Sequence, residues 1–213
     1  MQVTSACPLR VASILWQPRP GAAALTVVCK ATFTVQPGES PLAGTQDPVC
    51  TSDVPWEDGR GSLRAASDLV PFKRRVDVAV VGHAHAPRGT PATLLVARIA
   101  IAELDKSIEV HGDGWWTPDD QLTAAVPFSR MPLRWERAAG GPGTWNPVGL
   151  PPGAATDTQG LRPAPNLLPV GASLQMQSAL IPRSGLGPLA PTWPERVAKL
   201  RHHAGSWRHE AWA

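Results

Sequence analysis

The sequence predicts a mainly β protein, built as an antiparallel sheet or sandwich with long loops rich in proline and glycine. The chain of 213 residues contains 24 prolines and 19 glycines. Helices tolerate neither in number, because proline removes a backbone donor and glycine costs backbone entropy. Short runs rich in β-branched residues alternate with clusters of turn-forming residues. A helical pattern occurs only near the end, where it predicts a short C-terminal helix.

The first predicted elements are two strands, at residues 11–16 and 24–35. Both runs are apolar and rich in β-branched residues, and residues 28–33 alternate apolar and polar side chains. The segment between them, at 17–21, reads QPRPG and predicts the turn. Residues 37–60 follow as a loop region with clusters of Gly, Pro, Asp and Ser.

Further strands are predicted in the middle of the chain. A compact apolar run predicts a strand at 76–81, and runs at 92–104 and 106–110 predict a hairpin with its turn near Glu103. Residues 132–136 predict one more short strand. Strands joined by short turns in this way favour antiparallel pairing.

The C-terminal third changes character. Thr192 and Glu195 fit a capping box around Pro194, and an apolar stripe follows, which predicts a helix over 192–205. We therefore expect a β-rich domain over residues 1–137, an irregular segment rich in proline and glycine over residues 138–191 packed on it, and a short helix over 192–205. The helix is expected to belong to the same domain.

Composition excludes several classes of protein. The formal net charge is only +3, and no basic stripe with interleaved aromatic residues is present, so nucleic-acid binding is not expected. The three cysteines share no CxxC spacing, which argues against a zinc ribbon or a disulfide framework. No run of 18 apolar residues and no charged start followed by an apolar stretch occurs. We therefore expect a cytoplasmic protein that does not insert into membranes.

One set of residues allows a metal site. On a strand, His83 and His85 would share one face, and His111 and Asp113 in VHGDG could complete a transition-metal site. That interpretation would make the protein a metal-dependent hydrolase. Alternatively, these residues end strands and bind turn backbone. No nucleophile elbow, phosphate-binding loop or acid–base pair is evident, so we expect no enzyme and no cofactor, and keep the hydrolase as the alternative.

The run RWER is unusual. On a strand, Arg134 and Glu136 would share one face, and Trp135 and Arg137 the other. Arginine stacks on tryptophan and pairs with glutamate. The run therefore predicts either a recognition patch for a partner or a polar clamp that fixes the following glycine-rich loop to the sheet.

Several motifs occur in one order: KATFTV, SLRAASDLVPFK, VDVAVVGHAHAPRG, IEVHGDGWW, PFSRMPLRWERAAGG, WNPVG, PNLLP and GLGPLAPTWPER. In this order they resemble the DUF2169 family of bacterial type VI secretion accessory proteins, over about residues 10–212. The resemblance implies a cytoplasmic, non-catalytic adaptor that loads toxic effectors onto the spike tip. Its implied partners are proteins: an effector, a VgrG-type spike or a PAAR protein. Family members usually continue beyond the position of Ala213, so we expect this chain to be a shortened form.

Adaptors bind through interfaces in which a few aromatic and arginine anchors dominate the affinity. An exposed sheet edge can also take a partner strand. From side-chain type and motif density, we expect the partner-binding residues, as anchors or as supports of loops, to be Trp56, Phe72, Lys73, His83, His85, Trp116, Arg134, Trp135 and Arg137.

Overall fold

The computed structural model describes residues 3–56, 61–73, 76–150, 160–172, 183–190 and 192–193. The chain divides into two compact units. The first comprises Met1–Val54, Ala65–Val78 and Ala204–Ala213, and the second Pro55–Arg64 and Ala79–His203. The division falls within two short strands that pair with each other, β3 (Val54–Pro55) and β4 (Leu63–Ala65).

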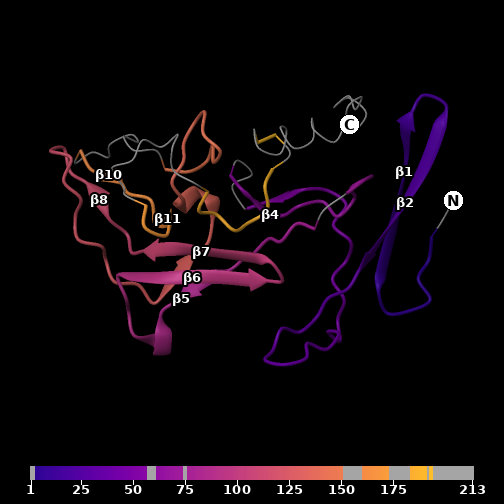
Figure 1. Cartoon of the computed structure of the whole chain (residues 1–213), viewed down its shortest axis with the longest axis horizontal. Helices are drawn as coiled ribbons and strands as arrows, with labels where there is room; N and C mark the ends of the chain where they lie inside the picture. Colours follow the sequence, from indigo (N-terminus) through magenta and orange to yellow (C-terminus); the bar gives the residue numbers. More distant parts are fainter. Residues whose placement is uncertain are drawn as a thin grey trace. The chain divides into compact units, whose positions relative to one another are not determined.

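The first unit contains a long antiparallel hairpin, formed by β1 (Arg10–Arg19) and β2 (Ala22–Lys30) (Figure 1). The predicted pair of strands is confirmed, but β2 ends at Lys30 and not at residue 35, and the turn is shorter than predicted. Residues 17–19 stay in β1 after a register shift, and the chain reverses at Pro20 and Gly21. Gly21 has φ 78°, a left-handed conformation that glycine adopts without strain.

Asp68 organises the loop that follows this hairpin. Its Oδ2 accepts hydrogen bonds from the Lys30 ammonium at 2.9 Å and from the Cys50 N–H at 2.7 Å. The buried Gln46 amide bonds both the N–H and the C=O of Thr32. Side chains thus supply the partners that a regular sheet would otherwise give this backbone.

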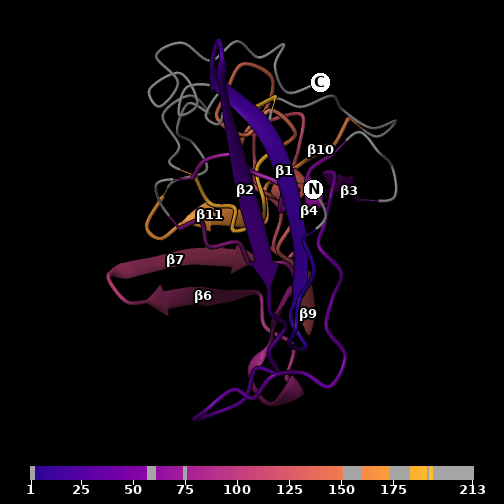
Figure 2. The same cartoon turned by 90° about the vertical axis from the view of Figure 1, so that its right-hand side faces the viewer.

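The second unit is built around a three-stranded antiparallel sheet. Strand β6 (Leu94–Ile101) pairs with β7 (Leu104–His111), and β7 pairs with β11 (Leu167–Pro169) on its other edge (Figure 2). The predicted hairpin is confirmed, with its turn at residues 102–103, where Ala102 has φ 50°.

Smaller antiparallel pairs complete this unit. Strand β5 (His83–His85) pairs with β9 (Arg130–Pro132), and β8 (Trp115–Trp116) pairs with β10 (Arg162–Pro163). The core between these elements is apolar and buried, and consists of Ala84, Ile108, Val110, Phe128, Met131, Leu133, Ala138 and Leu167.

Two predicted strands are wrong. Residues 76–81 form no ladder: Val76 is 87% exposed, and the Val80 N–H donates to the Leu186 C=O instead. The run 132–136 also fails, because the chain leaves β9 at Pro132 and enters a 3₁₀ turn, η2 (Trp135–Arg137). The Ala138 N–H folds back onto the Trp135 C=O at 3.1 Å, so the strand faces predicted for RWER do not exist.

The prediction of a mainly β fold with antiparallel pairing is confirmed. Within the described ranges, helical geometry is limited to the 3₁₀ turns η1 (Pro87–Gly89) and η2. No helix among these residues is long and apolar enough to cross a membrane. The predicted helix over 192–205 lies outside the described residues, apart from Thr192 and Trp193.

Candidate protein-binding surface

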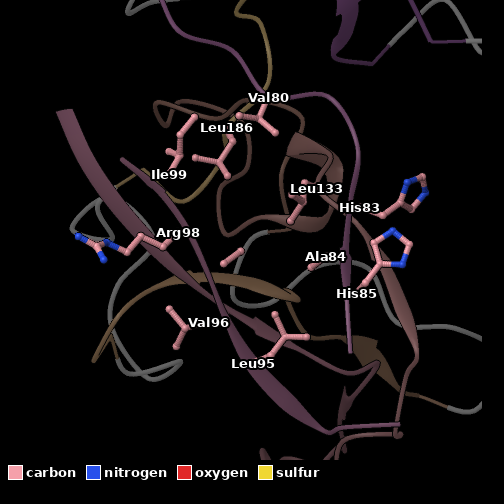
Figure 3. Close-up of a pocket in the computed structure, with 11 residues that line it drawn as sticks. Val80, His83, Ala84, His85, Leu95, Val96, Arg98, Ile99, Leu133 and Leu186 are labelled. Carbon is pink, nitrogen blue, oxygen red and sulfur yellow. The ribbon is translucent and has the colours of Figure 1, made fainter. Parts of the chain in front are cut away.

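Three basic side chains lie on the outer face of β5 and β9, and a fourth, that of Arg134, follows β9 directly before η2. We call His83, His85, Arg130 and Arg134 the basic cluster. Because Ala84 turns inward and is buried, both histidines of β5 face outward. In Figure 3 their rings point away from Leu133 and Leu186. The Arg130 guanidinium lies 2.9 Å from Nε2 of His83, and the two histidine ring centres are 6.2 Å apart.

The electrostatic environment of His83 reflects this crowding of positive charge. Loss of water around the ring and the nearby charges of Arg130, His85 and Arg134 lower the pKa of His83. Each of these effects disfavours protonation of the His83 ring, because the protonated ring carries a positive charge. A carboxylate brought to this face would relieve the repulsion, so the cluster is suited to an acidic partner.

Trp56 adds an aromatic surface beside the cluster. The Arg134 guanidinium carbon lies 3.8 Å from the centre of the Trp56 ring, within the range of a cation–π contact. Arg134 is exposed and Trp56 is half-buried. The stack therefore holds the guanidinium in one orientation at the surface.

The position of Trp56 is fixed by a second contact. The backbone N–H of Trp56 donates to the Ser62 C=O at 3.3 Å. Ser62 is buried, and its N–H and Oγ donate to the two carboxylate oxygens of Glu136, at 2.5 and 2.9 Å. Arg134 and Glu136 flank Trp135 in the turn at η2. This turn therefore holds the segment that contains Trp56 and Ser62 through the side chains of Arg134 and Glu136.

Trp135 supports this turn from below and is not part of the surface. It is 4% exposed, and its Nε1–H donates to the Gly187 C=O at 3.1 Å. Trp193 packs edge-on against it, with ring centres 5.5 Å apart. Gly185 approaches the ring so closely that a Cβ there would lie 2.2 Å from a ring carbon.

Arg137 forms a polar clamp at the ends of β7 and β11. Its Nη1 donates to Oδ1 of Asp113 at 2.8 Å and to Oδ1 of Asn166 at 3.0 Å. The Asn166 amide in turn donates to Asp113 and to the His111 C=O. This arrangement favours the clamp interpretation for Arg137, although the clamp fixes strand ends and not the glycine-rich loop.

Residues 20–212 match a family described as "Uncharacterized protein conserved in bacteria (DUF2169)". The chain belongs to the DUF2169 family. The basic cluster and Trp56 of this DUF2169 protein all lie within the matched region. No curated protein and no solved structure was found to match it.

Other residues predicted for partner binding in this DUF2169 protein lie apart from the cluster. Trp116 is half-buried and is paired with Arg162 in the β8–β10 ladder. Phe72 and Lys73 belong to the first unit, where Phe72 is exposed and Lys73 pairs with Asp77 at 2.9 Å. The structure therefore brings together Trp56, His83, His85 and Arg134 from the predicted set.

The four residues of the alternative metal site do not form one group. His111 lies at the end of β7, with its Nε2 3.1 Å from Oε2 of Glu109, and Asp113 pairs with Arg137. Over the ranges that the structure describes, no three His, Cys, Asp or Glu side chains are placed to hold a metal ion.

Arg130 is the one member of the basic cluster that sequence reasoning missed. It lies opposite His85 in the β5–β9 ladder, with 44 residues of sequence between them. Its neighbours in the sequence, PFSRMP, carry no sign of a functional role. Only the pairing of β9 with β5 reveals it.

Proposed function

We propose that this DUF2169 protein is a non-catalytic, cytoplasmic adaptor of type VI secretion that binds an effector, a spike-tip protein of the VgrG or PAAR type, or both. The order of its motifs, which resembles that of type VI accessory proteins, supports the class of partner. The observation that carries protein binding is the exposed Arg134–Trp56 stack beside three further basic side chains.

This surface has the chemistry of an interface anchor. Arginine and tryptophan are enriched among the residues that dominate binding energy. Among the described residues, no carboxylate pairs with Arg134. Its planar donors can therefore take a partner carboxylate in a bidentate pair. The stack on Trp56 orients the guanidinium in advance, which lowers the entropy cost of that pair.

Affinity purification of the tagged protein from its native cells, followed by mass spectrometry, tests the proposal. We expect to recover an effector, a spike protein or a PAAR protein. Replacing both Trp56 and Arg134 by alanine should weaken that binding by at least about 30-fold, as expected for loss of dominant anchors. Trp135 is left unchanged because it is buried and its loss would damage the fold.

The protein offers a matched control of the same chemistry. The Arg183 guanidinium lies over the exposed Trp145 ring at 4.7 Å, and neither residue belongs to the basic cluster. Trp145→Ala with Arg183→Ala should leave binding unchanged. If the wild-type protein recovers no type VI component, the proposed function is wrong. If it does, and the folded Trp56→Ala, Arg134→Ala variant binds equally well, only the assigned surface is wrong.

A further inference from the structure

A cavity of about 330 Å³ lies between β5 and β6 (Figure 3). A water molecule occupies about 30 Å³ of the liquid, so the space is large enough for several side chains. Its wall includes three consecutive residues of β5, 83–85, and five consecutive residues of β6, 95–99. Successive side chains of a strand point to opposite faces. A wall made of consecutive residues therefore places the backbone edge of each strand beside the cavity.

Among the described residues, the N–H and C=O groups on the edge of β6 that faces away from β7 find no hydrogen-bond partner. Leu94 lies opposite His111, and the Gly112 N–H donates to the Thr93 C=O, which makes Leu94 and His111 a non-hydrogen-bonded pair. The bonds to β7 therefore come from the odd-numbered residues of β6. The groups pointing away from β7 have no hydrogen bond to the described part of the protein; they are the N–H and C=O of Val96, Arg98 and Ala100.

The cavity beside this edge is lined mainly by apolar side chains, and basic side chains lie at the rim of the cavity. The apolar wall of the cavity is formed by Val80, Leu95, Ala97, Ile99, Leu133 and Leu186. The charged or titratable residues that line the cavity are His83, His85 and Arg98, and none of the lining residues is acidic. Arg98 pairs with Asp105 at 2.7 Å across the β6–β7 ladder. Val96, on the outer face of this edge, is 56% exposed, and an exposed apolar edge strand is a template for another polypeptide.

We propose that β6 binds an extended segment of a partner protein by addition of a strand, with apolar side chains entering the cavity and acidic side chains lying outside it, beside His83, His85 and Arg98. This inference rests on the proposed function and specifies the form of the partner segment. Backbone hydrogen bonds supply affinity in this mode, and the cavity selects alternate side chains. The basic rim selects acidic residues at the positions between them.

A synthetic peptide of alternating glutamate and valine is the first probe. With the whole protein, it should slow amide hydrogen exchange at Val96, Arg98 and Ala100, measured by NMR. The same peptide with methylated backbone nitrogens should give no protection, because it cannot form the ladder. Replacing its glutamates by lysines should weaken binding by about tenfold, because the ring N–H groups of His83 and His85 then lose their carboxylate acceptors.

Two variants of the protein test the same edge. Val96→Pro removes a backbone N–H that points away from β7 and takes no part in the β6–β7 ladder. Because proline is tolerated on such an edge, the sheet should still form. Val96→Thr keeps the N–H and serves as the matched control. We expect Val96→Pro to lose at least about tenfold in peptide affinity, the loss expected when a buried carbonyl is left unpaired, and Val96→Thr to retain it. If Val96→Pro does not fold, the methylated peptide decides the question with the wild-type protein.

The outcomes separate this inference from the proposed function. If the peptide protects none of the three amides, while wild-type protein still recovers a type VI partner, strand addition is wrong and the adaptor function stands. If protection arises without peptide and grows with protein concentration, the occupant is a second copy and the inference is wrong. If wild-type protein recovers no type VI partner, the proposed function fails whatever the peptide does.

Discussion

The side-chain amide of Asn146 donates a hydrogen bond to the backbone carbonyl oxygen of Trp135 at 2.8 Å. A second bond from the same Nδ2 reaches the Ala139 C=O at 3.2 Å. Asn146 is 4% exposed and lies so close to the backbone of Gly140 and Gly149 that a Cβ at either would come within 2.3 Å of it. One buried amide therefore holds the glycine-rich loop against the turn that carries Arg134.

Asn146→Asp should destabilise the protein by about 3 kcal/mol at pH 7, because a buried carboxylate would face carbonyl oxygens that have lost their donor. Part of the loss should be recovered as the pH falls, since the protonated carboxyl can again donate one hydrogen bond. Urea unfolding at several pH values measures this. Gln36→Glu makes the same change at an exposed site and should have little effect. Wild-type stability of Asn146→Asp at pH 7 would contradict the assigned role.

Gly185→Ala should cost about 2 kcal/mol or more of folding free energy, because the new Cβ overlaps the Trp135 ring and overpacking of a core forces side chains and backbone to shift. Thermal or urea unfolding measures the loss. Gly44→Ala is the matched control, because no atom lies within 4 Å of the Cβ it would add. An equal effect of the two substitutions would show that the close approach to Trp135 is not what limits position 185.

Acid should weaken the fold partly through Glu109. The Glu109 carboxylate accepts a hydrogen bond from the Gly171 N–H at 3.0 Å. This bond and the nearby His111 ring lower the pKa of Glu109 below its ordinary value, although burial acts in the opposite direction. The folded state therefore binds this proton less readily than the unfolded state. The resulting stabilisation is present above pH 4.5 and is lost as the pH falls from there through the folded pKa.

Glu109→Gln should therefore reduce the stability at neutral pH and make the stability less dependent on pH below 4.5. Some acid dependence should remain, because the Arg98 guanidinium also lowers the pKa of Asp105. Unfolding curves between pH 3 and pH 7 provide the measurement, with Glu103→Gln at the exposed hairpin turn as the control. A parallel pH dependence of Glu109→Gln and wild type would rule out this linkage.

The local parts of the fold were predictable from the sequence. The β1–β2 and β6–β7 hairpins each consist of two strands that are neighbours in sequence and are joined by a short turn. The alternation of apolar and polar side chains, together with turn-forming residues, therefore suffices to predict them. The run 76–81 shows the limit of this reasoning. Its alternating valines fit a strand, but a ladder also needs a partner edge, and only Val80 bonds across to residue 186.

The candidate surface was predictable only in part. His83 and His85 share a face because strand geometry alone requires it. The stack of Arg134 on Trp56 and the place of Arg130 beside His83 depend on pairings between segments distant in sequence. Nor could the sequence show that RWER is a 3₁₀ turn, in which Trp135 is buried while Arg134 remains exposed.

The contacts that position Trp56 have a consequence for biosynthesis. Ser62 needs Glu136, Trp56 needs Arg134, and β5 needs β9, all from segments that leave the ribosome much later. A nascent polypeptide that ends before Arg130 carries the tryptophan and both histidines but neither arginine. The basic cluster with its support at Trp56 can therefore form only after translation has passed residue 136, so a protein that recognises this surface does not bind shorter nascent chains.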